Sequence, residues 1–125
     1  MARILVVDDD AEIRAVIRLA LEQAGHEVTE AADGSEGLKL FLLHRTDLVI
    51  TDVFMPERDG VEFMHLIRLM VGTAPILVIS GGGVWPQEMV SLLDTTMRLG
   101  ATRTLRKPFR PAELVLIVED MLRVR

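Results

Sequence analysis

Short apolar runs alternate with longer amphipathic stretches along the whole chain. Residues 4–7 are continuously apolar, which is typical of a strand covered on both faces of a parallel sheet. From residue 13 to residue 24, apolar positions recur with helical spacing, and Gly25 is a good helix stop. Four more pairs of a short apolar run and an amphipathic stretch follow, and no linker or repeated motif interrupts them. The pattern predicts a single domain over residues 1–125.

The pattern predicts strands at residues 4–7, 26–31, 47–51, 76–79 and 102–105. The second run is the most polar, so we expect it at a sheet edge. A helix is expected after each strand: over the stripe 13–24, from Asp33-Gly34, after Gly60, from Trp85-Pro86, and after the turn 106–109. Their predicted inward faces carry Leu38, Phe41 and Leu42, then Val61, Met64, Ile67 and Val71, and in the last helix Leu114, Ile117, Val118 and Met121. Such alternation implies an α/β fold, doubly wound, with right-handed crossovers and helices on both faces of a parallel sheet.

Composition narrows the possible functions. The 125 residues are 50% apolar and carry a formal net charge of −5, which disfavours direct binding to nucleic acid or to an anionic membrane. The absence of cysteine excludes disulfides, zinc–thiolate sites and a thiol nucleophile. No apolar run approaches the length of a membrane span, and the N-terminus does not resemble a signal peptide. We therefore expect a cytoplasmic protein.

Polar side chains follow four of the five predicted strands. Asp8, Asp9 and Asp10 come after the first strand and Asp52 after the third, and Ser80 and Lys107 end the fourth and fifth. In open α/β sheets the ligand site lies beyond the carboxyl ends of the strands. These side chains are therefore expected to meet in one crevice.

Carboxylates gathered in one crevice repel each other. Two unit charges ~4 Å apart cost about 4 kcal/mol at an effective dielectric constant near 20. Mg²⁺ is the natural counter-ion, because it takes carboxylate, carbonyl and water ligands and commonly binds a phosphoryl oxygen as well. Lys107 and Ser80 can bond the same phosphoryl group. The set predicts a site that accepts a phosphoryl group on a carboxylate.

Several short motifs carry a family resemblance. The chain resembles the receiver domain of bacterial two-component response regulators over essentially its full length. The motifs are Leu5-Val6-Val7-Asp8-Asp9-Asp10, Asp52-Val53-Phe54-Met55-Pro56 with Asp59-Gly60, Ser80, Leu99-Gly100-Ala101, and Lys107-Pro108-Phe109. The resemblance implies a flavodoxin-like (βα)5 fold with strand order 2-1-3-4-5.

The resemblance also implies a role for each site residue. Asp52 is the expected phosphoacceptor, and Asp8 and Asp9 are the acidic pair that binds Mg²⁺ together with Asp52 and the backbone carbonyl of Phe54. Ser80 is the expected switch hydroxyl, and Lys107 bonds the phosphoryl oxygens.

The resemblance implies partners in a phosphorelay. The implied phosphodonor is a sensor histidine kinase or a histidine phosphotransfer protein. Because no effector segment follows Arg125, we expect a stand-alone switch, like a chemotaxis regulator, that acts by binding a downstream protein. Leu19 and Leu116 point away from the inward stripes, which is ordinary for single leucines. The functional alternative is that the first helix docks the phosphodonor, while the face of the last helix and fifth strand meets another protein or a second copy, as in a homodimer. The domain is not expected to be an enzyme, although it assists its own phosphorylation and dephosphorylation.

Three positions depart from the common receiver pattern. Thr104 stands where the family often has an aromatic side chain, so we expect the signal to travel through residues 80–98 without a rotamer flip. Phe54 and Gly82 stand where polar side chains position the attacking water in some members. We therefore expect slow hydrolysis of the phosphoaspartate.

Other interpretations remain open at this point. The Asp8–Asp10 triplet taken alone fits a turn followed by a helix N-cap, and Asp10 is expected to be that cap. A phosphohydrolase with an aspartyl nucleophile is disfavoured, because Phe54 stands where a second acid is usual. A receiver that binds proteins without phosphorylation is favoured only by Thr104.

Overall fold

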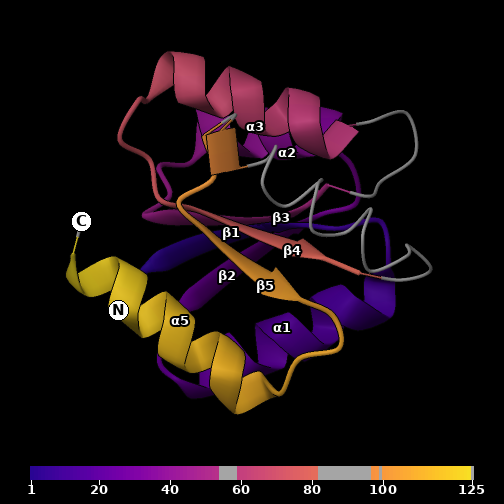
Figure 1. Ribbon diagram of the computed structural model, residues 1–125, viewed down its shortest axis with the longest axis vertical. Helices are drawn as coiled ribbons and strands as arrows, with labels where there is room; N and C mark the ends of the chain where they lie inside the picture. Colours follow the sequence, from indigo (N-terminus) through magenta and orange to yellow (C-terminus); the bar gives the residue numbers. More distant parts are fainter. Residues whose placement is uncertain (54–58, 82–96, 99, 125) are drawn as a thin grey trace.

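Five parallel strands form one sheet in the order β2-β1-β3-β4-β5. The computed structural model describes residues 1–53, 59–81, 97–98 and 100–124 (Figure 1). The strands are β1 (Arg3–Val7), β2 (Glu27–Ala31), β3 (Leu48–Asp52), β4 (Ile76–Ser80) and β5 (Arg103–Arg106). The predicted fold class and strand order are confirmed, and β2 lies at an edge as its polarity indicated. Each strand end lies within one residue of its predicted position.

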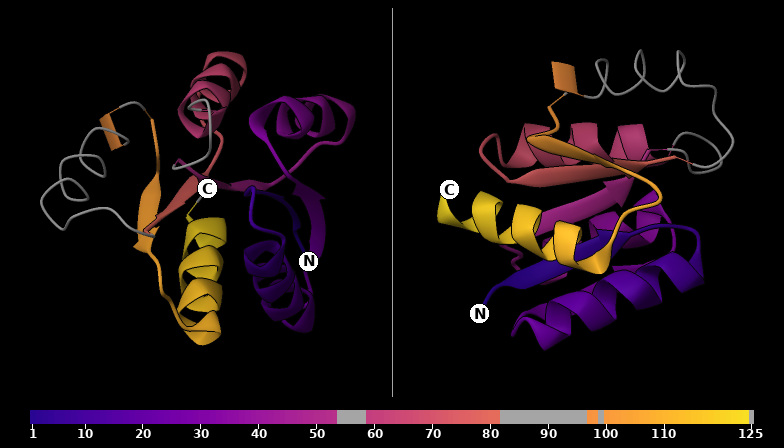
Figure 2. Two further views of the ribbon diagram at one scale, coloured as in Figure 1. Left: turned by 90° about the vertical axis from the view of Figure 1, so that its right-hand side faces the viewer. Right: turned by 60° about the horizontal axis from the view of Figure 1, so that its bottom comes forward.

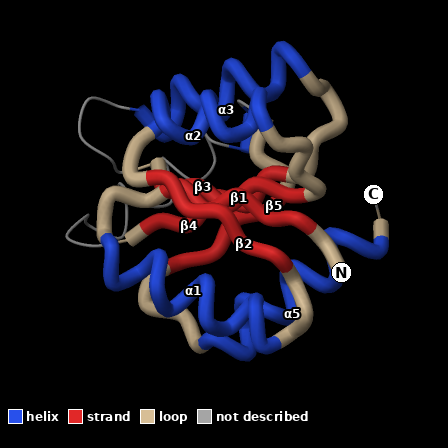
Figure 3. The backbone as a smooth tube through the Cα atoms, turned by 180° about the vertical axis from the view of Figure 1, so that it is seen from behind, coloured by secondary structure: helices blue, strands red, loops and turns tan. Residues whose placement is uncertain are grey.

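Helices cover both faces of the sheet (Figures 2 and 3). The helices α1 (Ala11–Gln23) and α5 (Pro111–Arg123) lie on one face, and α2 (Gly34–Leu43) and α3 (Asp59–Met70) lie on the other. The helix predicted to begin at Trp85 and Pro86 lies outside the described residues. Among the residues described, no helix has the length and apolar character needed to cross a bilayer.

The core has two layers because successive strand residues point to opposite faces of the sheet. From β1, Ile4 and Val6 join the layer beneath α1 and α5. Leu5 and Val7 join the layer beneath α2 and α3. All four side chains are completely buried, which explains the continuous apolar run in the sequence.

Local signals set the helix ends. Asp10 is the N-cap of α1, and its carboxylate accepts from the backbone N–H groups of Glu12 and Ile13 at 2.9 and 3.4 Å. Asp33 caps α2 in the same way, accepting from Glu36 N at 2.8 Å. Gly25 follows α1 with a φ of 93°, a conformation that favours glycine. The prediction that Asp10 is a cap is confirmed.

Two inward-facing assignments are wrong. Leu42 is 63% exposed, because α2 approaches the sheet through Gly34 and Gly37, which turns position 42 outward. A Cβ at Gly37 would lie 2.8 Å from Cγ2 of Val7, so glycine permits this close approach. Val71 is exposed because α3 ends at Met70.

Candidate functional site

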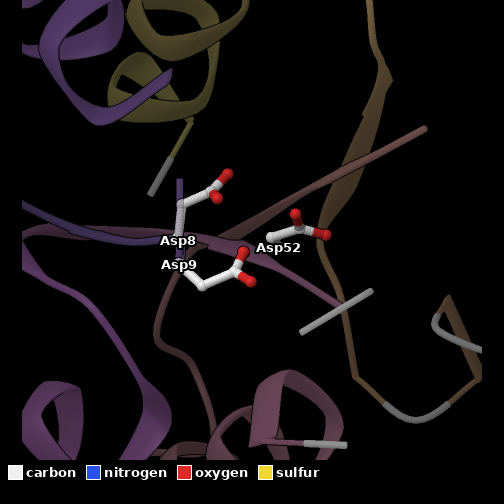
Figure 4. A group of neighbouring side chains, drawn as sticks. All are labelled: Asp8, Asp9 and Asp52. Atoms are coloured by element: carbon white, nitrogen blue, oxygen red, sulfur yellow. The ribbon is translucent and has the colours of Figure 1, made fainter. Parts of the chain in front are cut away.

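Acidic side chains from two adjacent strands converge at the carboxyl edge of the sheet. Asp8 directly follows β1, and Asp52 is the last residue of β3, which pairs with β1. Carboxylate oxygens of Asp8, Asp9 and Asp52 lie within 4.8 Å of one another (Figure 4). Asp8 and Asp52 are buried, whereas Asp9 is exposed. The predicted convergence of these three carboxylates is present.

Asp8 is held on both carboxylate oxygens. Its Oδ1 accepts from the backbone N–H of Asp10 at 2.9 Å, and its Oδ2 accepts from Nζ of Lys107 at 3.0 Å. Burial raises the pKa of the Asp8 carboxyl group above its usual value, and the nearby charge of Asp52 acts in the same direction. The bonds from Asp10 and Lys107 oppose this rise without cancelling it. Burial thus penalises the charged form of Asp8, and its two hydrogen bonds offset that penalty only in part.

Lys107 supplies the positive charge of the crevice. Its Nζ lies 2.9 Å from Oδ2 of Asp52, in addition to its contact with Asp8. Burial lowers the pKa of the Lys107 ammonium group, but the bonds and charges of Asp52 and Asp8 outweigh burial, so the pKa is raised. The ammonium group stays charged and bridges the two buried carboxylates.

Close packing of the loops after β4 and β5 places Lys107. Its backbone N–H donates to the carbonyl oxygen of Ser80 at 2.6 Å. A Cβ at Gly81 would lie 2.6 Å from Cβ of Lys107, which leaves no room there for a larger residue. Ser80 itself is fully buried at the end of β4. The predicted hydroxyl therefore lies on the strand next to Asp52.

The three carboxylates fit a divalent cation. Opposite ligands of an octahedral Mg²⁺ stand about 4 Å apart, which is close to the spread of the oxygens of Asp8, Asp9 and Asp52. One ammonium group offsets only one of these three negative charges, so a doubly charged ion would balance the remainder. Carboxylate oxygens are the ligand type that Mg²⁺ prefers.

Two predicted positions, Phe54 and Gly82, lie outside the described residues. The predicted metal-binding carbonyl and the predicted slow hydrolysis therefore stay predictions. Thr104 is half-buried in β5 and pairs with Val78 of β4.

Sequence reasoning missed the supporting role of two residues, although Gly60 belongs to one of the motifs. Arg14 of α1 donates from Nη1 to the backbone carbonyl of Asp8 at 2.6 Å and from Nε to Glu30 of β2 at 3.1 Å. Its position four residues after the N-cap Asp10 is a signal that could have indicated it. Gly60 of α3 lies against the site, since a Cβ there would be 2.0 Å from the carbonyl oxygen of Asp52.

Glu30 anchors both arginines of α1. It accepts from Arg18 at 2.9 Å as well as from Arg14. The bond from Arg18 is the main cause of a lowered pKa of the Glu30 carboxyl group, and the bond from Arg14 adds to it. The ion pairs thereby connect β2 and α1 to the backbone of the acidic cluster.

Comparison with known proteins agrees with this geometry. Residues 4–119 match the family described as response regulator receiver domain. The transcriptional regulatory protein PrrA of Mycobacterium tuberculosis is 37% identical over 123 residues, which cover 98% of this chain and 51% of PrrA. The alkaline phosphatase synthesis transcriptional regulatory protein PhoP of Bacillus subtilis is 35% identical and is matched over 48% of its length. This chain thus spans about half the length of these relatives.

Solved structures of similar size superpose along nearly the whole chain. The chemotaxis protein CheY4 of Vibrio cholerae is 35% identical with a TM-score of 0.84, and the match covers 97% of this chain and 98% of that protein. A response regulator of Chloroflexus aurantiacus, itself described as putative, is 34% identical with a TM-score of 0.87, and 98% of each chain is covered.

Proposed function

The chain belongs to the response regulator receiver family, and from that premise we propose that it is a phosphorylation-dependent switch whose phosphoacceptor is Asp52. The observation that carries the proposal is the grouping of the Asp52, Asp8 and Asp9 carboxylates around one crevice with Lys107 bonded to two of them. This is the charge arrangement that phosphoryl transfer to a carboxylate requires.

The proposed transfer is a displacement at phosphorus. A carboxylate oxygen of Asp52 forms the new P–O bond, and the P–N bond of a donor phosphohistidine breaks, so that the imidazole leaves with the bonding electron pair. Asp8 and Asp9 hold Mg²⁺ in this proposal. When bound, Mg²⁺ supplies positive charge to the phosphoryl oxygens. Lys107 exchanges its bond to Asp52 for one to a phosphoryl oxygen.

Phosphorylation would drive the switch through new bonds. The phosphoryl group brings about −1.5 to −2 charges and several strong acceptors. The Lys107 ammonium group already bonds Asp52, and Ser80 ends β4, the strand that pairs with β3. Shifting a two-state equilibrium nearly to completion takes about 5.5 kcal/mol. Two or three charge-assisted bonds at about 1.5–3 kcal/mol each supply that amount.

The proposed phosphodonor is a sensor histidine kinase or a histidine phosphotransfer protein, with α1 as its docking helix. The proposed output is altered binding of a downstream protein in the cytoplasm, rather than enzymatic turnover. A second function, protein binding without phosphorylation, is favoured by one observation: Thr104 occupies the position on β5 where many family members have an aromatic side chain.

One experiment separates these functions. The protein is incubated with acetyl phosphate and Mg²⁺, and its intact mass is followed over time beside the Asp52→Asn variant. We expect a lasting gain of one phosphoryl group that requires Mg²⁺ and Asp52. Rapid consumption of the donor without a lasting gain would instead indicate a phosphohydrolase. No gain and no consumption would support the phosphorylation-independent module.

A further inference from the structure

The outer surface of α2 and α3 concentrates exposed apolar side chains. Single exposed leucines are ordinary, but a contiguous apolar surface marks an interaction site. On α2, on α3 and at the residue that follows α3, the exposed large apolar side chains are Leu42, Leu43, Leu66, Leu69, Met70 and Val71. We give the name α2–α3 face to the surface formed by Leu42 and Arg45 on the α2 side and by Glu62, Leu66 and Leu69 on α3. The partly buried Leu38, which also packs against the core, lies at its edge.

The α2–α3 face is hollowed at both ends. A hollow of about 220 Å³ lies between the helices beside Leu38, Glu62 and Leu66. A larger one of about 470 Å³ lies beyond the last turn of α2, where Leu42, Arg45 and Val71 contribute to its walls. The α2–α3 face therefore combines protruding leucine side chains with two hollows, and a partner of complementary shape can fill the hollows.

The two ends of the α2–α3 face carry opposite charges. Both helices follow parallel strands, so both begin at the carboxyl edge of the sheet and run to the opposite edge (Figures 1 and 2). Glu62, in the first turn of α3, therefore lies near the carboxyl edge, and Arg45, two residues past α2, lies at the far edge. Neither side chain has an ion-pair partner among the described residues.

We propose that the α2–α3 face is a self-association interface, in which two copies pack antiparallel about a twofold axis. In this arrangement Glu62 of each copy meets the partner's Arg45, and Leu66 and Leu69 pack against the partner's Leu42 and Leu38. A twofold interface uses the same patch on both copies, so every pair forms twice. Parallel packing would instead place like charges together.

The charge pattern selects a second copy over other occupants. An anionic membrane would be repelled by Glu62 and by the net charge of −5. The competing surface lies between α1 and α5, beside Ala20, Val115 and Leu116. There the acidic side chains already have partners within the chain, since Glu119 bonds His26 and Asp120 bonds Arg103 and Arg123. Of these two surfaces in the described part of the chain, the α2–α3 face is the one whose opposite charges are left to pair across an interface.

Charge reversal tests the twofold register directly. Sedimentation of the unphosphorylated protein over a series of micromolar concentrations gives the dimer dissociation constant. We expect Glu62→Arg and Arg45→Glu each to weaken the dimer by about tenfold or more, because each variant creates two like-charge pairs. An equimolar mixture of the two variants should recover a heterodimer close to wild type, because both of its pairs are again Glu–Arg.

A matched pair of apolar variants locates the surface. Leu69 on α3 and Leu116 on α5 are both 71% exposed. We expect Leu69→Ser to weaken the dimer and Leu116→Ser to leave it unchanged, with circular dichroism confirming that both fold. A wild-type protein that stays monomeric would overturn the proposal. Charge-reversed variants that dimerise normally, a mixture that fails to recover, or loss of the dimer in Leu116→Ser would do the same. None of these measurements depends on phosphoryl transfer to Asp52.

Discussion

The ammonium nitrogen of Lys107 lies 2.9 Å from Oδ2 of Asp52, and the same nitrogen lies 3.0 Å from Oδ2 of Asp8. One lysine therefore joins the ends of β1 and β3 across the crevice, although it lies 55 residues from Asp52 in the sequence. A phosphoryl group on Asp52 would compete for this ammonium group. The contact therefore links the stability of the unphosphorylated fold to the chemistry of the site.

Removing the bridging ammonium group should destabilise the fold. We expect Lys107→Met to lower the free energy of unfolding by about 3 kcal/mol at neutral pH, because it leaves two buried carboxylates without their cation. The raised pKa of Lys107 means that its stabilising effect is present below the usual lysine value of 10.5 and is lost as pH rises through the folded-state pKa.

Urea unfolding of the wild type and of Lys107→Met at several pH values measures this difference. The difference in the free energy of unfolding between the two proteins should be constant near neutral pH and should become smaller in strong alkali. Lys39→Met is the control, because Lys39 is exposed. Equal losses in the two variants would contradict the bridging role.

The carboxylate of Asp9 lies close to those of Asp8 and Asp52 and has no ion-pair partner among the described residues. Its negative charge should therefore destabilise the folded protein when no divalent ion is bound. We expect Asp9→Asn to stabilise the metal-free protein by up to about 1 kcal/mol, since it removes repulsion from Asp8 and Asp52. We also expect Mg²⁺ to raise the melting temperature of the wild type more than that of the variant.

Thermal unfolding with a chelator and with Mg²⁺ gives both quantities. Asp10→Asn is the matched control, because asparagine caps a helix as well as aspartate does. A Mg²⁺ effect that persists fully in Asp9→Asn would remove Asp9 from the metal site.

Gly60 should tolerate no side chain. A Cβ at this position would lie 2.0 Å from the carbonyl oxygen of Asp52 and 2.7 Å from Cα of Val53, so the backbone of the acceptor strand would have to move. We expect Gly60→Ala to cost about 3 kcal/mol of stability. Gly72→Ala should change stability little, because its Cβ would have no neighbour closer than 4.0 Å. Chemical denaturation of both variants tests the contrast, and similar stabilities would refute it.

Glu30 should stabilise the fold in a pH-dependent way. Its pKa is lowered by Arg18 and then by Arg14, so its contribution is present above the usual glutamate value of 4.5 and is lost as pH falls through the folded-state pKa. We expect Glu30→Gln to be less stable by about 1 kcal/mol at neutral pH. The difference should vanish in acid. Urea unfolding at several pH values measures the stability difference between the wild type and Glu30→Gln. If this difference is as large in acid, where Glu30 is protonated, as at neutral pH, the ion pairs are not its cause.

The site was predictable from sequence where chemistry coincides with strand ends. Asp8, Asp52 and Ser80 each end or follow an apolar run, and Lys107 follows the short, more polar strand predicted at residues 102–105. The geometry of a parallel sheet brings such strand ends together. The contacts of Arg14 and Gly60 depend instead on how α1 and α3 dock against the sheet. The place of Arg14 one turn after the cap Asp10 marks it only as a candidate. Leu42 and Val71 were predicted to face inward because of their helical spacing alone. In the structure, α2 contacts the sheet through Gly34 and Gly37, which turns Leu42 outward, and α3 ends at Met70, before Val71.

The central claim is that Asp52 accepts the phosphoryl group, and it can be tested by identifying the modified residue. An acyl phosphate is reduced by borohydride, so the protein is treated with acetyl phosphate and Mg²⁺, reduced, digested and sequenced by mass spectrometry. The account predicts reduction at position 52 and none at Asp8 or Asp9. Reduction at either of those residues instead, or the same labelling in the Asp52→Asn variant, would contradict it.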